Sequence, residues 1–107
     1  MFSVEISGSA RLLSAIFRQA SLGSKIPDRH DLMTALMVIG RVQKDDLMDE
    51  RGFSSWSIAL SNKLHWLLNG NDVEVDWEEA AQWLEKMSQL YERPPSNSDS
   101  NLRRDSI

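Results

Sequence analysis

Apolar residues recur every three or four positions along most of this chain, the spacing of amphipathic helices. The pattern predicts four helices, within residues 9–22, 28–44, 54–69 and 76–93. Serine or aspartate stands near the start of each stretch, and glycine or proline follows three of them, as is typical of helix caps. The expected fold class is therefore mostly α, a small helical bundle of three to five helices.

Two short segments alternate apolar and polar residues with a period of two, which is typical of half-buried strands. They are Phe2 to Ser7, before Gly8, and Val73 to Val75, after a strong Asn-Gly turn signal. A lone strand would leave its backbone hydrogen-bonding groups unpaired. We therefore predict that the N-terminal strand and residues 73–75 pair in a minor two-stranded β ribbon.

The second helical stretch is apolar around well over half of its circumference. Its apolar residues are Leu32, Met33, Leu36, Met37, Val38, Ile39 and Val42. A helix of this kind is buried on several sides, which predicts the central helix of the domain or a subunit interface. Gly40 would let another backbone approach closely. A homodimer through residues 32–42 is one hypothesis that follows.

Length and composition place the chain among small soluble domains. With 107 residues it can bury one core, and we expect a single helical domain over 1–93 followed by a flexible polar tail over 94–107. Without cysteine it gains nothing from an oxidising compartment. Because no signal peptide and no long apolar run is visible, the expected location is the cytoplasm, with no membrane partner.

Charge is distributed unevenly along the chain, whose net charge is −4. Residues 1–44 carry six basic and three acidic side chains, a net of +3. Residues 45–92 carry eleven acidic and three basic side chains, a net of −8. Such a field favours a partner with a basic surface, and it makes nucleic acid a disfavoured partner without excluding it.

The candidate partner-binding residues are an acidic run and two tryptophans. They are Asp72, Glu74, Asp76, Glu78, Glu79, Trp66 and Trp83. Five like charges within eight residues produce a strong local field, although turn formation and helix capping explain three of them equally well. Both tryptophans lie toward the edges of apolar helix faces, where a large ring suits either a partner contact or packing at the edge of the core.

Nothing in the sequence marks an active site. Asp28, His30 and Asp31 lie together, but residues so close to a helix start more often cap the first turn. No serine occupies a nucleophile elbow, and no glycine-rich loop suits a phosphate. We therefore expect no catalytic residues, no metal ligands, no cofactor and no enzymatic activity.

One segment resembles a known DNA-binding family. In residues 47–58 a glycine, Gly52, is followed by an apolar residue, serines and the apolar Ile58. This order resembles the helix-turn-helix proteins, and the resemblance implies a transcription regulator. Met48 and Ser61 depart from the pattern, and four acids at 45–50 would oppose phosphate contacts.

Together these observations favour a non-enzymatic protein-binding module: a small adaptor, inhibitor or regulator that occludes a basic surface of a macromolecular partner. Acidic proteins of this size are frequent among phage and mobile-element inhibitors, although size and charge alone do not place the chain there. The alternative is a DNA-binding regulator of the helix-turn-helix type.

Overall fold

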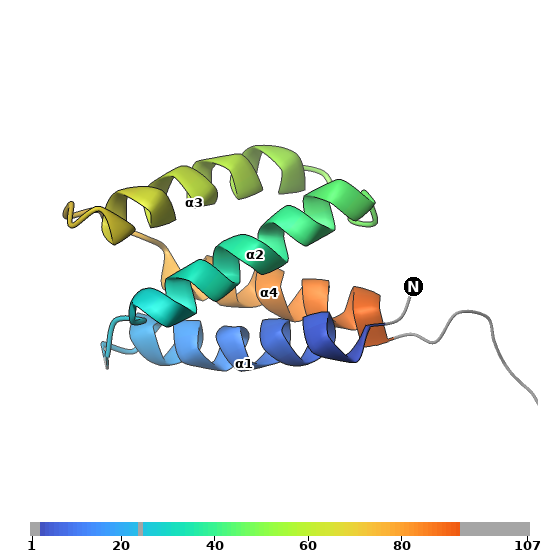
Figure 1. Ribbon diagram of the computed structural model, residues 1–107, viewed down its shortest axis with the longest axis horizontal. Coiled ribbons are helices and arrows are strands. Elements are labelled where there is room, and N and C mark those ends of the chain that lie inside the picture. Colours follow the sequence, from blue (N-terminus) through green and yellow to red (C-terminus); the bar gives the residue numbers. More distant parts are fainter. Residues whose placement is uncertain (1–2, 24, 93–107) are drawn as a thin grey trace, which may run out of the picture.

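The computed structural model describes residues 3–23 and 25–92, and all of the regular structure in them is helical. Its elements are α1 (Val4–Ser21), α2 (Arg29–Asp45), α3 (Phe53–Leu68) and α4 (Trp77–Glu92) (Figure 1). The predicted helical bundle is confirmed. The predicted tail, 94–107, lies outside the described residues.

The predicted N-terminal strand is wrong, because residues 4–7 form the first turn of α1. The Ser3 hydroxyl caps this turn by accepting a hydrogen bond from the Ile6 N–H at 3.3 Å. Ile6 also starts a helical row of buried residues that continues with Ala10, Leu13 and Phe17. The alternation of Val4 and Ile6 is thus the start of a helix, in which Val4 is exposed and Gly8 is an ordinary interior residue.

The second predicted strand is also absent, and so is the β ribbon within the described part of the chain. Residues 71–76 link α3 to α4 without regular structure. Val75 is buried and Val73 is half-buried, while Asp72, Glu74 and Asp76 are exposed. The alternation therefore arises because Val73 and Val75 of a connecting segment pack on the core. No strand of the described residues lies beside this segment.

α1 and α4 form the most extensive helix pair of the fold, and they run antiparallel. Both helices carry small buried residues, Ser7 and Ser14 on α1 and Ala81 and Ser88 on α4, and Ser14 and Ser88 line one hollow between the helices. Each pair is spaced seven residues apart, two helical turns, so the small side chains share a face and let the backbones approach closely.

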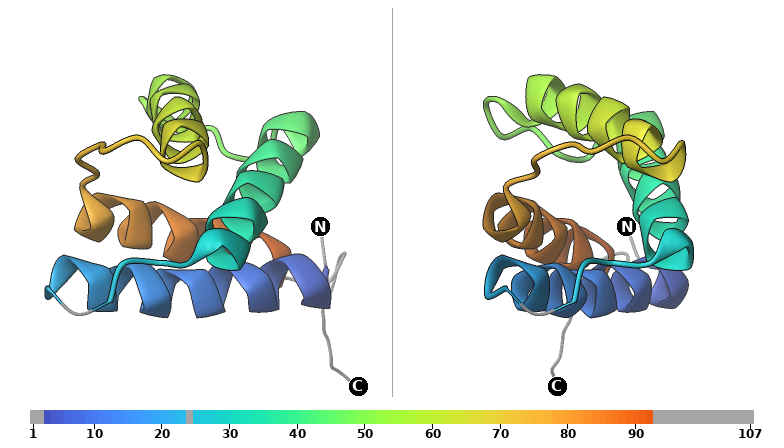
Figure 2. Two further views of the ribbon diagram at one scale, coloured as in Figure 1. Left: turned by 60° about the vertical axis from the view of Figure 1, so that its left-hand side comes forward. Right: turned by 90° about the vertical axis from the view of Figure 1, so that its left-hand side faces the viewer.

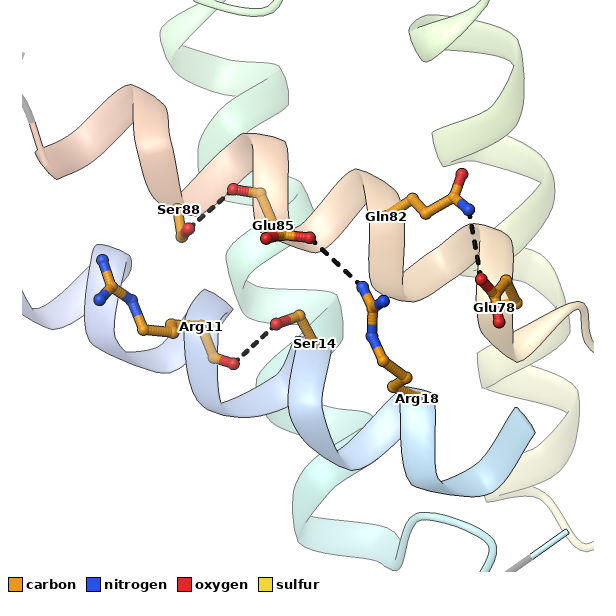
Figure 3. Close-up of polar contacts among 7 residues, drawn as sticks. All are labelled: Arg11, Ser14, Arg18, Glu78, Gln82, Glu85 and Ser88. Carbon is orange, nitrogen blue, oxygen red and sulfur yellow. Dashed lines mark hydrogen bonds and ion pairs between the residues drawn. The ribbon is translucent and has the colours of Figure 1, made fainter. Parts of the chain in front are cut away.

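Polar contacts lie along the edges of the α1–α4 pair. The Ser3 N–H donates to the Tyr91 carbonyl at 2.9 Å, which joins the start of α1 to the end of α4. Arg18 pairs with Glu85 at 3.3 Å, and Arg11 pairs with Glu92. In Figure 3 the Arg18–Glu85 pair bridges the two helices. These exposed pairs fix orientation more than they stabilise the fold.

α2 packs on α1 and on α3, and α3 lies apart from α1 (Figure 2). Two hydrogen bonds set α2 against α3. Gln43 donates to the buried Ser57 hydroxyl at 2.8 Å, and Arg29 donates to the Leu68 carbonyl at 3.3 Å. The first bond joins the end of α2 to the start of α3, and the second joins the start of α2 to the end of α3. The two helices are therefore antiparallel.

α2 itself is capped as the sequence predicts, but it is not buried all round. Asp28 and Asp31 form a capping box at its start. Its core side is formed by Leu32, Ala35, Val38, Ile39 and Val42. Met33 and Met37 are 51% and 54% exposed. The expectation of a central helix is therefore wrong for one face of α2, which no other helix of the described chain covers.

A polar network holds the C-terminal end of α2 against α4. The buried Tyr91 hydroxyl donates to Asp45 Oδ2 at 2.7 Å, and Arg41 Nε donates to the same oxygen at 2.8 Å. The Tyr91 bond first, and then the Arg41 bond, lower the pKa of Asp45 below its ordinary value of 3.8. Burial and the Asp45 hydrogen bond raise the pKa of Tyr91.

This network predicts a loss of stability in acid. The folded chain holds Asp45 with a depressed pKa, so its contribution is present above about pH 4 and is lost as the pH falls through the folded-state value. We expect Asp45→Asn to lower the thermal midpoint at pH 7 and to flatten its decline below pH 4, both measured by circular dichroism. Parallel acid profiles for the two proteins would show that Asp45 gains nothing from Tyr91 and Arg41.

Candidate functional site

An open hollow beside the end of α3 brings together an exposed tryptophan and two acids. Its lining residues are Trp66, Asn71, Asp72, Val73 and Glu74. The chain turns back after α3 through Gly70, whose φ of 88° suits glycine. The Asn71 N–H then donates to the Trp66 carbonyl at 3.0 Å, which fixes the link against the last turn of the helix. We call this set the Trp66 hollow.

The Trp66 hollow combines apolar area with unneutralised negative charge. The Trp66 residue is 58% exposed, although it is one of the largest apolar groups in the chain. Asp72 and Glu74 are exposed, and no ion pair of the described residues involves either of them. An exposed ring beside two free carboxylates is suited to the aliphatic stem and charged end of a lysine or arginine.

The other acids of the predicted site lie elsewhere. Asp76 caps α4 by accepting the Glu79 N–H at 3.0 Å, as its spacing predicts. Glu78 accepts a hydrogen bond from Gln82 at 3.4 Å on the outer side of α4 (Figure 3). Glu79 lines a second hollow together with Trp56. Of the seven predicted residues, the structure gathers Trp66, Asp72 and Glu74 at one hollow.

Trp83 lies in an aromatic cluster between α3 and α4. Its ring stacks on Trp56 with centroids 5.2 Å apart, and it contacts Phe53 at 5.4 Å. Lys86 Nζ lies 4.9 Å from the Trp83 ring and pairs with Glu50 at 2.7 Å. The half-buried Trp83 therefore joins two helices, and these contacts favour packing at the edge of the core over its predicted role as a partner anchor.

Sequence analysis missed this cluster, together with the Tyr91–Asp45 bond. Both connect residues that are far apart in the chain, so no local sequence pattern predicts them. The only available signal was the number of tryptophans, four in all.

Two of the three residues considered for catalysis, Asp28 and Asp31, cap the start of α2. Asp28 and Asp31 bond to each other's backbone N–H groups, and the Asp31 N–H bond lowers the pKa of Asp28. The His30 carbonyl accepts the Thr34 hydroxyl at 2.9 Å. Within residues 3–23 and 25–92, no three His, Cys, Asp or Glu side chains lie close enough to hold a metal ion. Nor does any described helix combine the length and apolarity needed to cross a bilayer.

The segment that resembles a helix-turn-helix has a different local geometry. Residues 47–50 are not helical, and seven residues, 46–52, connect α2 to α3. The usual motif joins its two helices by a turn of about three or four residues. Residues 47–50 therefore do not form the first helix of such a motif, while DNA binding itself stays a prediction.

Comparison with known proteins adds no further constraint to this geometry. No family model matches the chain, and no match is found among curated proteins or among solved structures.

Proposed function

We propose that this chain is a non-enzymatic protein-binding module whose Trp66 hollow engages a basic surface of a protein partner. The observation that carries the proposal is the exposure of Trp66 beside Asp72 and Glu74 in one hollow. Aromatic residues are over-represented among the side chains that dominate binding energy at protein interfaces. By covering a basic surface, such a module acts as an adaptor or an inhibitor.

Charge supports the same proposal. The hollow belongs to the half of the sequence with a net charge of −8, and complementary fields steer association between proteins. Glu74 and Glu78 make a matched pair for a test, since both are exposed acids of the same run and only Glu74 lines the hollow. Replacing either one by lysine changes the net charge equally.

We expect Glu74→Lys to slow association about tenfold at low ionic strength and less at high ionic strength, because salt screens the steering field. Glu78→Lys should have a much smaller effect. The measurement is surface plasmon resonance with a host protein that binds the immobilised wild-type chain. Equal slowing by both reversals would mean that the overall field acts and that the hollow is no binding site.

The tryptophan provides a second test at the same site. Trp66→Ala should speed dissociation about tenfold or more, which corresponds to about 1.4 kcal/mol, because it removes a ring buried by the partner. The fold should persist, since Trp66 is mostly exposed. A partner that dissociates from Trp66→Ala at the wild-type rate would contradict the proposal. A DNA-binding regulator would instead retard duplex DNA at low salt.

A further inference from the structure

The Trp66 hollow has a neighbour on the same side of α3, the hollow that contains Trp56, and the two have walls in common. One wall is a row of α3 residues at intervals of three, four and three, which share a helix face: Trp56, Ala59, Lys63 and Trp66. The other wall is the link from α3 to α4. Its residues 71–74 line the Trp66 hollow, and residues 75 and 76 line the Trp56 hollow. We call the two hollows together the α3 groove.

The link that forms one wall of the α3 groove has unpaired backbone groups. Val73 and Val75 pack on the core, while Asp72 and Glu74 are exposed, and this period of two is typical of an extended chain. No backbone hydrogen bond in the described part of the chain involves residues 72–75. Their N–H and C=O groups therefore lack partners in the fold, as on an edge strand. In the right-hand view of Figure 2 the link runs across the front of the molecule, from the end of α3 to the start of α4.

The α3 groove is acidic, and its charge is not neutralised within the fold. Its walls carry four acids and one base: Asp72, Glu74, Asp76, Glu79 and Lys63. None of the five takes part in an ion pair of residues 3–23 and 25–92. Asp76 is engaged at the start of α4, and Lys63 faces the same half of the groove. The attraction for a base is therefore strongest in the other half, beside Asp72 and Glu74.

These features indicate which element of a partner fits the groove. The inference rests on the proposed function, because it specifies what the basic partner supplies at that surface. We propose that the α3 groove takes an extended segment of the partner, which pairs with the backbone of residues 72–75 and carries bases at alternate positions over Asp72 and Glu74. Side chains of an added strand repeat every second residue, as these two acids do, and opposed charges of opposite sign stabilise a strand pair.

The dimensions and the charge of the groove favour this occupant over two others. The row from Trp56 to Trp66 is about 15 Å long, which about five extended residues span. A helix in the groove would leave the backbone of residues 72–75 unpaired. A second copy that paired through the same link would set Asp72 and Glu74 against identical acids, which is unfavourable.

The probe is a peptide of about six residues, blocked at both ends, in which arginine and valine alternate. A control peptide has the same composition, with the arginines in one block and the valines in another. We expect the alternating peptide to bind at least tenfold more tightly in isothermal titration calorimetry, and to weaken as salt is added. Equal affinity for the two, or no binding of the alternating peptide at millimolar concentration, would overturn the proposal.

Methylated peptides test whether the backbone of the probe takes part. The N–H groups of a strand point alternately to its two edges, and only one edge can face the link. Methylating the nitrogens of the arginines blocks one edge, and methylating those of the valines blocks the other. We expect one of these two peptides to lose at least tenfold in affinity while the other binds like the parent. Equal affinities of the two methylated peptides would contradict strand pairing.

Amide hydrogen exchange, read by nitrogen-15 NMR with the alternating peptide bound, tests the same contact on the chain. We expect at least tenfold slower exchange at one alternate pair of amides, either 72 and 74 or 73 and 75, with the other pair unchanged. Uniform protection of residues 72–75, or none, would refute an added strand.

Two lysines provide a matched pair of variants. Lys63→Ala removes the only base of the α3 groove and should tighten the alternating peptide about threefold, because a like charge is lost beside it. Lys44→Ala removes the same charge from an exposed position of α2 and should leave the affinity unchanged. Equal effects of the two substitutions would show that the peptide does not lie in the groove.

The captured partner protein separates this inference from the proposed function. If its binding responds to Trp66→Ala and Glu74→Lys, while the amides of residues 72–75 gain no protection, the hollow binds a basic surface and the extended segment is refuted. If its binding responds to neither substitution, the proposed function fails as well. Sensitivity to both substitutions, together with alternate protection of residues 72–75, is the result that we expect.

Discussion

Phe17→Ala is expected to lower the free energy of unfolding by about 3 to 5 kcal/mol, the usual range for a buried phenylalanine. Phe17 is fully buried on α1 and meets the ring of Trp77 edge-on, with centroids 5.2 Å apart. The substitution therefore removes a large apolar group and an aromatic contact together. Because the ring lies in the core beside the closely packed α1–α4 pair, its neighbours have little freedom to fill the space.

The measurement for Phe17→Ala is urea unfolding followed by circular dichroism, with Leu12→Ala as the matched control on the same helix. Leu12 is exposed, so its variant should change stability by less than about 0.5 kcal/mol. Similar losses at the two positions would mean that the Phe17 side of α1 does not face the core.

Ile39→Ala is expected to cost about 2 to 4 kcal/mol, since Ile39 is fully buried on the core side of α2. Leu36→Ala should cost clearly less, because Leu36 is only half-buried at the edge of that side. Met37→Ala should be almost neutral. Chemical denaturation of the three variants therefore measures how burial varies around the circumference of α2. Equal losses of unfolding free energy at all three positions would contradict an uncovered face on this helix.

The sequence predicts α2, α3 and α4 well because their local signals agree. α2 and α4 combine an apolar row of helical spacing with a recognisable start, the Asp28–Asp31 box and the Asp76 cap. α3 is predicted by its apolar row alone, and the serine expected to cap it does not, because its N-cap is Gly52 and no side chain caps it. The start of α1 is predicted wrongly, because the period-two alternation of Phe2 to Ser7 before Gly8 favours a strand. An interior glycine costs a helix only about 1 kcal/mol, and the burial of Ile6 and Ala10 on the core side outweighs it.

The candidate site is predictable only where it is local. Trp66, Asp72 and Glu74 are joined by one tight turn, so their proximity follows from the chain itself. The position of Trp83 depends on how α3 lies over α4, which no short-range spacing encodes. The uncovered face of α2 was not predicted for the same reason. The apolar residues of α2 show how much of its surface can be buried, but the packing of the other helices decides which of these residues are buried.

The central claim, that the Trp66 hollow is the partner-binding surface, is tested most directly by nitrogen-15 NMR of the chain with the partner protein that it captures. The four tryptophans give four indole N–H signals: Trp66 reports on the hollow, Trp77 on the core beside Phe17, and Trp56 and Trp83 on the aromatic cluster. We expect the largest changes at the Trp66 indole and at the backbone amides of Asp72 and Glu74, with the Trp77 indole unaffected. Large changes confined to the outer side of α4 around Glu78, with the Trp66 signal unmoved, would contradict the claim.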